Sequence, residues 1–416
     1  MYGFLKKREQ GSLRPIRLKR AETTKRVYDI QLSQNKEISR AHRGGVTCLS
    51  LEGVEQRYLM SGGSDGYIHI YDLHTHSRGN YTKIKPVASV SRYNRHLYAV
   101  SSVAWFPFDT GMFISSSFDK TIRVWDTNSM TAACNFPLDS RVYCQAISPI
   151  ASHCLVASAA AEPRIRLCDL KSGAFTHSLT GHTGEVYSCT WSPSKEHILY
   201  SGGNDGAVRV WDIRRASACL MSLDQDNGVD RDPLAETNSA HGNKGVNGLT
   251  LTSDGRYLVT LGMDEKIRLW DTTNGHNTFV NYGSYWRNRF KSHLQAVVSD
   301  ADVWPPLLFV PSDDQQVLVY SLLDGRLTKR LKGAYGRVTS VERRSSYQEL
   351  YSGSNEGEIL VWEPTKKSST VGTAVNNTTL GSTLTTSFVD DMANNTTMEG
   401  ILDAWSDSDD DEHGSP

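Results

Sequence analysis

The stretch GHTGEVYSCTWSPSKEHILYSGGNDGAVRVWD, residues 181–212, decides the fold of this chain. It ends in the aromatic–acidic pair Trp211-Asp212, and two aliphatic residues, Val208 and Val210, alternate with polar residues just before that pair. This period of two indicates a β-strand. Six residues before Trp211, Asp205 lies in the glycine-rich sequence SGGNDG, which is typical of a tight turn between two strands. The stretch therefore predicts a β-hairpin.

The same pattern recurs along the chain, so this hairpin is one of a series. Each copy has aliphatic residues one and three positions before its final pair and an acid six positions before it. The seven copies end at Tyr71-Asp72, Trp125-Asp126, Cys168-Asp169, Trp211-Asp212, Trp270-Asp271, Tyr320-Ser321 and Trp362-Glu363. Their spacings of 54, 43, 43, 59, 50 and 42 residues approach the roughly 40–45 of a four-stranded propeller blade. The sequence therefore predicts an all-β protein with seven blades.

Over about residues 25–364 these motifs resemble the WD-repeat family, which implies a closed β-propeller. A closed ring has no free sheet edge if one terminus supplies a strand to the blade at the other terminus. The alternation in Arg26–Leu32 predicts that this segment completes the last blade. We therefore expect an N-terminal helical docking segment over residues 1–22, a seven-bladed propeller over residues 23–364, and an acidic tail over residues 365–416.

Histidine, aspartate and serine recur around the predicted turns. A catalytic triad of this composition would occur once, whereas this combination repeats from unit to unit. It resembles the hydrogen-bonded brace found within WD-repeat blades. The resemblance implies a structural role for His42, Asp65, Asp119, His182, Ser201, Asp205, Trp211, His241 and Asp264.

We predict no catalytic, cofactor-binding or metal-binding residues, and the chain is not expected to be an enzyme. Its seven cysteines contain no Cys-x-x-Cys pair, which argues against a disulfide framework or a zinc ribbon. Cysteines within predicted strands, such as Cys48, Cys168 and Cys189, are expected to be small buried thiols. We interpret the pair His74 and His76 as part of a solvated loop rather than as metal ligands.

The net charge of -1 conceals opposite charges at the two ends of the chain. Residues 1–26 contain nine Lys or Arg and two acids, whereas residues 365–416 contain nine acids and two lysines. The near-neutral body between them does not resemble a sequence-specific nucleic-acid-binding domain, which carries a basic stripe. The sequence contains no run of about 18 apolar residues, so no membrane span is predicted.

The first 22 residues combine basic and apolar side chains, with a break at Gly11 and Pro15. We interpret them as a helix, a break and a second helix. Their apolar side chains favour docking into a partner's groove, with a nuclear import patch or a frayed leader as the alternative. The predicted contacts are Tyr2, Phe4, Leu5, Leu13, Ile16 and Leu18.

Arg214 follows Asp212 by two positions, and the other Trp-Asp and Tyr-Asp pairs have no basic residue there. Trp211, Asp212 and Arg214 resemble the Trp-Asp-x-Arg motif of WD-repeat substrate receptors. These receptors dock onto the large subunit of the damage-specific DNA-binding protein, the adaptor of cullin-four RING ubiquitin ligases. The resemblance implies that Trp211, Asp212 and Arg214 contact this adaptor.

Further stretches resemble the WD-repeat receptors of transcription-coupled nucleotide excision repair. They are residues 3–5, 18–22, 109–121, 168–173, 211–217, 280–283, 349–354 and 403–406, whereas residues 284–302 match poorly. The resemblance implies a nuclear, non-catalytic substrate-recognition subunit. Its implied partners are the adaptor, cullin-four and its RING subunit, the Cockayne syndrome group B protein and stalled RNA polymerase II. The alternative is a nuclear scaffold that binds histones or nucleic acid without a ubiquitin role.

The longest spacing, between Trp211 and Trp270, indicates an insertion within residues 223–240. This polar, turn-rich stretch predicts a surface loop. We expect substrate to bind rigid turns on the disc face opposite the adaptor, or on the side of the disc, rather than the loop over residues 226–236.

The tail is rich in Ser, Thr and Asn and ends in a run of acids over residues 403–412. It is expected to be disordered, although Trp405, Ser406 and Ser408 offer an alternative role as a recognition or phosphorylation element. Truncation after Pro364 should therefore leave the melting temperature nearly unchanged. A large fall in a thermal unfolding measurement would show that the tail packs on the folded body.

Overall fold

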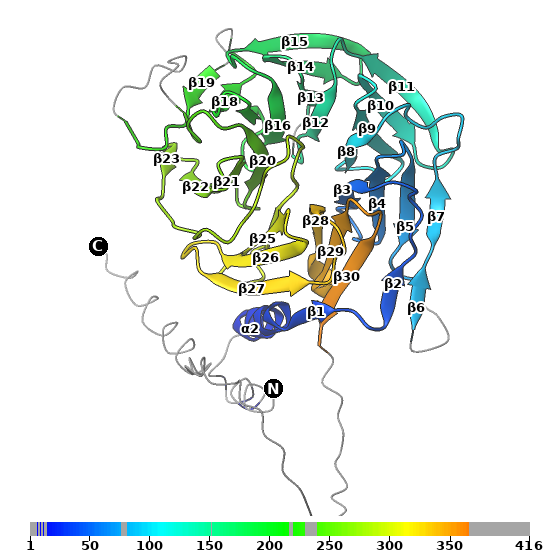
Figure 1. Cartoon of the computed structure of the whole chain (residues 1–416), viewed down its shortest axis with the longest axis vertical. Helices are drawn as coiled ribbons and strands as arrows, with labels where there is room; N and C mark the ends of the chain where they lie inside the picture. Colours follow the sequence, from blue (N-terminus) through cyan, green and yellow to red (C-terminus); the bar gives the residue numbers. More distant parts are fainter. Residues whose placement is uncertain are drawn as a thin grey trace, which may run out of the picture. The chain divides into compact units, whose positions relative to one another are not determined.

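The computed structural model describes residues 6, 9, 11, 15–75, 81–150, 152–215, 219–228 and 239–365. Seven four-stranded antiparallel sheets are arranged as blades around a central axis (Figure 1). A short parallel pair, β2 (Lys36–Ile38) with β6 (Thr82–Ile84), lies outside the blades. The predicted seven-bladed propeller is confirmed.

In each blade the four strands follow one another from the central axis outward. Blade one contains β3 (Val46–Leu51), β4 (Tyr58–Gly63), β5 (Ile68–Asp72) and β7 (Pro86–Ser89). Blade two contains β8 (Val100–Trp105), β9 (Met112–Ser117), β10 (Thr121–Asp126) and β11 (Thr131–Pro137). Blade three contains β12 (Val142–Ile147), β13 (Leu155–Ala160), β14 (Arg164–Asp169) and β15 (Ala174–Thr180). Blade four contains β16 (Val186–Trp191), β17 (Ile198–Gly203), β18 (Val208–Asp212) and β19 (Cys219–Ser222).

The remaining blades follow the same order. Blade five contains β20 (Val246–Leu251), β21 (Tyr257–Gly262), β22 (Ile267–Asp271) and β23 (His276–Asn277). Blade six contains β24 (Val297–Val298), β25 (Leu307–Ser312), β26 (Gln316–Ser321) and β27 (Leu327–Lys332). Blade seven contains β28 (Val338–Arg344), β29 (Glu349–Ser354), β30 (Ile359–Pro364) and the N-terminal strand β1 (Ile30–Leu32), with the 3-10 turn η1 (Ser345–Tyr347) between β28 and β29.

The strand β1 closes the ring. Ile30 lies opposite Pro364 and Leu32 opposite Trp362, and the backbone N–H of Ser33 donates to the carbonyl of Val361 at 2.8 Å. The predicted closure is thus confirmed, because the outer edge of the last blade is covered by the other end of the propeller.

The predicted start of the closing strand at Arg26 is wrong, since residues up to Tyr28 are helical. Helix α2 (Pro15–Tyr28) begins with a proline, which suits the first helical position because its missing N–H has no helical partner there. The helix buries Thr23, Thr24 and Val27, and this spacing places them on one helical face. Val27 enters the core between blades six and seven, so tertiary burial overrides the strand-like alternation.

The core lies between successive blades. Trp125, Trp211, Trp270 and Trp362, the aromatic residues of four signature pairs, are fully buried. Trp211, for example, packs with Leu167 of blade three and Leu199 of blade four. Each signature tryptophan therefore serves the packing of one blade against its neighbour.

The predicted brace is a set of hydrogen bonds inside the blades. In blade four, His182 Nδ1 lies 3.0 Å from an Asp205 carboxylate oxygen and its Nε2 lies 2.7 Å from Ser201 Oγ. The Ser201 hydroxyl also accepts a 2.7 Å hydrogen bond from the indole N–H of Trp211. Because each polar side chain is paired, the blade can bury them at little cost.

Three other blades contain the same arrangement. His42 bonds Asp65 and Ser61 in blade one, and His241 bonds Asp264 and Thr260 in blade five, where threonine replaces the serine. In blade two, Asp119 pairs with His96, which the sequence analysis did not identify. The separation of 23 residues between histidine and aspartate is the same in all four blades and would have revealed His96.

The braces make folding sensitive to acid. Burial lowers the pKa of His96 and His241 despite the neighbouring carboxylates, so both imidazoles remain neutral in the folded chain. Burial is the largest single influence and would raise the pKa of Asp65 and Asp264, but the hydrogen bonds and charge interactions with His42 and His241, together with the other donors around each carboxylate, outweigh it and lower both values to about 2. For all four groups the unfolded chain binds protons more readily than the folded chain, so stability is lost as the pH falls.

We therefore expect the urea midpoint to fall as the pH decreases from about 7 to 5, because His96 and His241 protonate in the unfolded chain. A second fall is expected below about pH 4, where Asp65 and Asp264 each lose a contribution on the order of 1–2 kcal/mol. The variant His241→Gln should be less stable at pH 7 and show a shallower slope between pH 7 and 5. A midpoint independent of pH from 7 to 4 would contradict this account.

Candidate protein-interaction surface

The two faces of the disc are built from different turns. Because every blade has the same strand order, the third strands all end on one face, here called the exit face, at residues such as Asp126, Asp212 and Asp271. The opposite face, here called the brace face, carries the turns that contain Asp65, Asp119, Asp205 and Asp264. A partner that contacts one face therefore leaves the other accessible.

Arg214 lies on the exit face, just past the end of β18. Its Nε and Nη2 donate to the two carboxylate oxygens of Asp212 at 3.0 and 2.8 Å. Asp212 is buried, whereas the Arg214 side chain is 62% exposed. Hydrogen bonding from Arg214, together with its charge, lowers the pKa of Asp212 to about 2. The pair holds a planar cation at the surface in a defined orientation.

Two other blades provide a comparison for this ion pair. In blade one, Asp72 receives a similar two-point contact from Arg57, which comes from the turn before β4 rather than from the position after the pair. In blade three, Lys171 occupies the position equivalent to Arg214, and its backbone N–H donates to Asp169 at 3.1 Å. Lysine lacks the guanidinium fork, so Lys171 is a natural matched control for Arg214.

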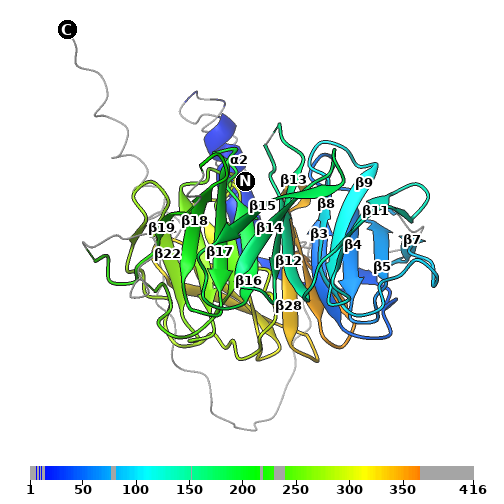
Figure 2. The same ribbon diagram turned by 90° about the horizontal axis from the view of Figure 1, so that it is seen from above.

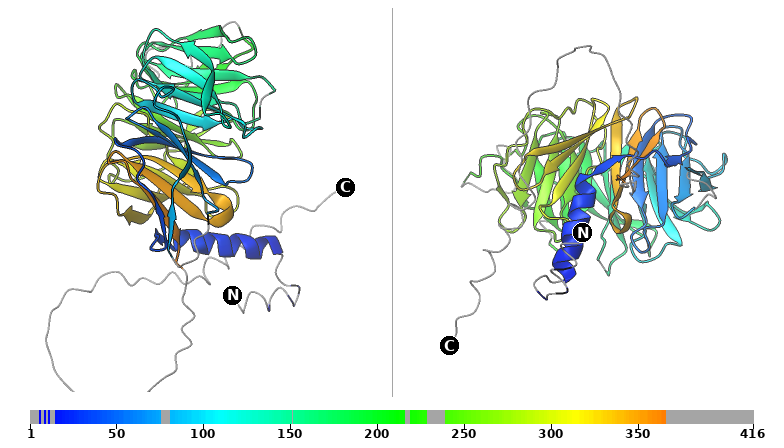
Figure 3. Two further views of the ribbon diagram at one scale, coloured as in Figure 1. Left: turned by 90° about the vertical axis from the view of Figure 1, so that its right-hand side faces the viewer. Right: turned by 90° about the horizontal axis from the view of Figure 1, so that it is seen from below.

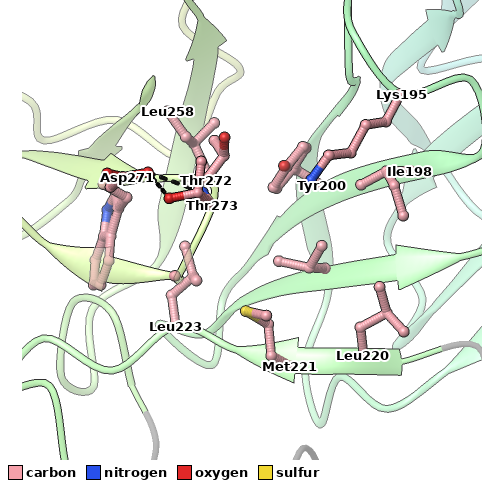
Figure 4. Close-up of a pocket in the computed structure, with 13 residues that line it drawn as sticks. Lys195, Ile198, Tyr200, Leu220, Met221, Leu223, Leu258, Asp271, Thr272 and Thr273 are labelled. Carbon is pink, nitrogen blue, oxygen red and sulfur yellow. Dashed lines mark hydrogen bonds between the residues drawn. The ribbon is translucent and has the colours of Figure 1, made fainter. Parts of the chain in front are cut away.

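An apolar cleft opens between blades four and five (Figure 4). Its lining includes Ile198, which lies opposite Asp212 in the β17–β18 ladder. The cavity has a volume of about 100 Å³, and Lys195 stands at its edge. The rest of the lining is Tyr200, Val210, Leu220, Met221, Leu223, Leu258, Trp270, Asp271, Thr272, Thr273 and Gly275. A space of this size, walled mainly by apolar groups, can receive one apolar side chain of a bound protein.

Helix α2 also belongs to the exit side of the disc. Thr24 Oγ1 accepts a hydrogen bond from the backbone N–H of Trp304 at 3.1 Å, in the turn that precedes β25. The Tyr28 carbonyl accepts one from Lys329 Nζ at 3.1 Å. From this anchored end the helix extends past the disc, and Ile16 near its start is exposed (Figures 2 and 3). The propeller therefore presents the first turns of α2 to solvent.

Two of the predicted docking residues, Ile16 and Leu18, lie on α2, where Ile16 is exposed and Leu18 half-buried. The second helix is longer than predicted. Tyr2, Phe4, Leu5 and Leu13 lie outside the described residues. The structure thus brings part of the leader and the Arg214 ion pair to the same face.

The predicted loop over residues 223–240 is only partly a surface feature. Its two ends, Leu223 and Ala240, are buried in the core between blades four and five. Residues 229–238 lie outside the described residues. The polar composition of the stretch as a whole gave no indication that these two residues are buried.

The brace face carries exposed aromatic side chains. Tyr93 and Tyr98 lie in the connection between β7 and β8, and Tyr335 lies between β27 and β28. The guanidinium of Arg337 stacks 4.1 Å from the ring centre of Phe290, which is also exposed. Exposed aromatic side chains on turns are typical of protein-binding surfaces.

Residues 284–302, which match the receptor family poorly, are an integral part of the fold. Trp286 is buried, and its indole N–H donates to the carbonyl of Pro311 at 2.8 Å. Asn288 bonds Asn247 of blade five through both side-chain amides. This segment therefore fills the space beside the two-residue strand β24.

The cysteine expectation is confirmed for Cys48, Cys168 and Cys189, which are buried free thiols. Among the residues that the structure describes, no group of three or more His, Cys, Asp or Glu side chains is placed to hold a metal ion. No described helix is long and apolar enough to span a membrane.

The chain belongs to the WD-repeat family, whose members are generally non-catalytic scaffolds and receptors. The model of the WD domain, G-beta repeat, matches residues 26–72, 87–126, 173–212 and 233–271. These matches cover repeats that end at four of the seven signature pairs.

The chain is similar to relatives with different names. The WD repeat-containing protein ATCSA-1 of Arabidopsis thaliana is 34% identical over 88% of this chain and 95% of its own length. Radiation-sensitive protein 28 of Saccharomyces cerevisiae is 24% identical over 62% of this chain and 55% of its own length. A ribosome biogenesis protein WDR12 homolog of Chlamydomonas reinhardtii is 37% identical over 42% of this chain and 38% of its own length.

Removing the Arg214 side chain should change the surface without unfolding the disc. In Arg214→Ala the pKa of Asp212 should rise from about 2 toward its ordinary value near 4, while the melting temperature stays nearly constant because Arg214 is mostly exposed. Carboxylate NMR titration and thermal unfolding measure the two effects. The variant Lys171→Ala should leave the Asp212 titration unchanged, and a large loss of melting temperature in Arg214→Ala would contradict this surface assignment.

Proposed function

We propose that this protein is the non-catalytic substrate-recognition subunit of a cullin-four RING ubiquitin ligase and acts in the nucleus in transcription-coupled nucleotide excision repair. It would be a receptor of the Cockayne syndrome group A type. The observation that carries the proposal is its similarity, over nearly the whole length of both chains, to the Arabidopsis relative whose name contains CSA. The name of the yeast relative, Radiation-sensitive protein 28, is in keeping with a role after DNA damage.

The exit face supports contact with the adaptor. An exposed helical turn and an oriented arginine lie on the same face, where one partner surface can engage both. The apolar cleft between blades four and five offers a third contact point for the same partner. Together these elements can approach the area of a stable protein–protein interface, which a single exposed arginine cannot provide.

The brace face supports contact with substrate. If the adaptor occupies the exit face, the exposed aromatic residues of the brace face remain accessible to the Cockayne syndrome group B protein and stalled RNA polymerase II. The receptor then acts by raising the effective concentration of substrate lysines near the ubiquitin-conjugating enzyme. This role requires a rigid platform and no catalytic residue of its own.

The adaptor contact can be tested with the purified large subunit of the damage-specific DNA-binding protein. Deletion of residues 1–21 should abolish its capture by the full chain, because the leader supplies the docking helix. Arg214→Glu should weaken capture by about tenfold or more, because an acid replaces the exposed cation. Affinity is measured by surface plasmon resonance.

The matched control is Lys171→Glu, which makes the same charge change at the equivalent position of blade three and should leave adaptor binding unchanged. Undiminished binding by both the deletion and Arg214→Glu would refute the exit-face assignment. Recovery of histones or nucleic acid without cullin and adaptor in an affinity purification would instead favour the nuclear scaffold.

A further inference from the structure

Two cysteines occupy equivalent positions on the innermost strands of different blades. Cys48 is the third residue of β3 and Cys144 the third residue of β12, and each follows a register irregularity with the next strand. Their side chains are almost equally buried, at 2% and 3% exposure. Any difference in their reactivity must therefore come from their neighbours rather than from their place in the sheet.

Cys144 has a histidine neighbour that does not repeat in the other blades. His293 lies in the segment before β24, and its Nε2 is 3.8 Å from the Cys144 sulfur. The Cys144 thiol also lies 3.8 Å from the carbonyl oxygen of Cys189 on β16. These contacts join residues that are 149 and 45 positions apart in the chain.

The backbone on both sides of His293 is fixed to blade five. The Asn247 side-chain amide donates to the carbonyl of Ser292 at 2.8 Å, and the Leu294 N–H donates to the carbonyl of Asn247 at 3.0 Å. The Nδ1 atom of His293 is buried and has no protein partner among the described residues. The ring is therefore held in place with its Nε2 directed at the Cys144 sulfur.

The electrostatics of the two equivalent cysteines differ accordingly. A hydrogen bond from Cys189 and the positive charge of His293 lower the pKa of Cys144 against the cost of burial. Burial alone would lower the pKa of His293, but the charge and hydrogen bond of the Cys144 thiolate and the backbone of Asn247 together outweigh burial and raise it. Burial raises the pKa of Cys48 to about 12. The titratable groups that act on Cys144 are thus His293 and Cys189, while Cys48 remains an ordinary buried thiol.

We propose that Cys144 and His293, which contact each other on the inner side of the propeller, form a reactive thiol site whose co-reactant is a small soft electrophile such as hydrogen peroxide. The histidine accepts the thiol proton, and the sulfur attacks one peroxide oxygen. The S–O bond forms as the O–O bond breaks, and the departing hydroxide takes the proton from His293 to leave as water. Sulfur is oxidised to the sulfenic acid and the peroxide is reduced. This site is independent of the ubiquitin-ligase proposal.

The test uses the unmodified full chain, because Cys48 serves as the internal control. The chain is treated with iodoacetamide, quenched at intervals, and analysed by peptide mass spectrometry for each cysteine. Cys144 should react about tenfold or more faster than Cys48 at pH 7, with a rate nearly independent of pH between about 6.5 and 8, whereas the Cys48 rate should rise with pH. Equal rates for the two cysteines would overturn the proposal.

A variant then tests the histidine. His293→Gln should reduce the Cys144 rate to that of Cys48 and restore a rise with pH, while His177→Gln, a change at an exposed histidine on β15, should alter neither rate. With hydrogen peroxide, dimedone should trap a sulfenic acid at Cys144 before any appears at Cys48. A Cys144 rate unaffected by His293→Gln would show that the histidine does not activate the thiol. If His293→Gln fails to fold, the comparison of Cys144 with Cys48 in the unmodified chain still decides the question.

Discussion

The pairing of β1 with β30 is the contact on which the rest of this molecule depends. Each blade of a ring buries its apolar faces against two neighbours, so an open ring would expose one face of the first and one face of the last blade, together with an unpaired strand edge. Ile30 and Leu32 pair with Pro364 and Trp362, which lie 334 and 330 positions further along the chain. The same junction receives Val27 of α2, so closing the ring also sets where the leader leaves the disc.

Contacts that recur from blade to blade differ in kind from contacts that do not recur. The braces occur in four blades, and each consists of a buried histidine, an acid and a hydroxyl whose hydrogen bonds satisfy one another. Such an arrangement stabilises a blade but has no free group for chemistry. Other contacts do not recur in this form: Arg214 reaches Asp212 from two residues after it, whereas Arg57 reaches Asp72 from the preceding turn, and His293 approaches Cys144.

The connection between blades five and six shows how such a contact arises. The strands β23 and β24 have only two residues each, and the connection between them runs over residues 278–296. Trp286 anchors this connection in the core, and Asn247 holds it beside blade five. The connection thereby brings a histidine toward the inner strands, where a regular blade would supply none.

The sequence by itself determined the number of blades, the position of each signature strand and the existence of the braces. These features follow from local rules, since strand alternation and turn chemistry act over a few residues and repeat seven times. The sequence also indicated that Arg214 is at the surface, because a residue just after the end of a strand lies in a turn at the edge of the blade. The constant offset between histidine and aspartate also predicts His96 as the partner of Asp119.

Only the tertiary structure decided which non-local groups meet. Residues 26–28 alternate like a strand but form a helix, because Val27 finds a core between two blades that no local pattern describes. Leu223 and Ala240 are buried at the two ends of a mostly polar stretch, because the neighbouring blade provides apolar side chains against which they pack. Cys48 and Cys144 occupy equivalent strand positions and are almost equally buried, but His293, 149 residues beyond Cys144, lies beside Cys144. The connection between blades five and six, held by Asn247 and Trp286, brings that imidazole to this thiol, and no local pattern in the sequence encodes the approach.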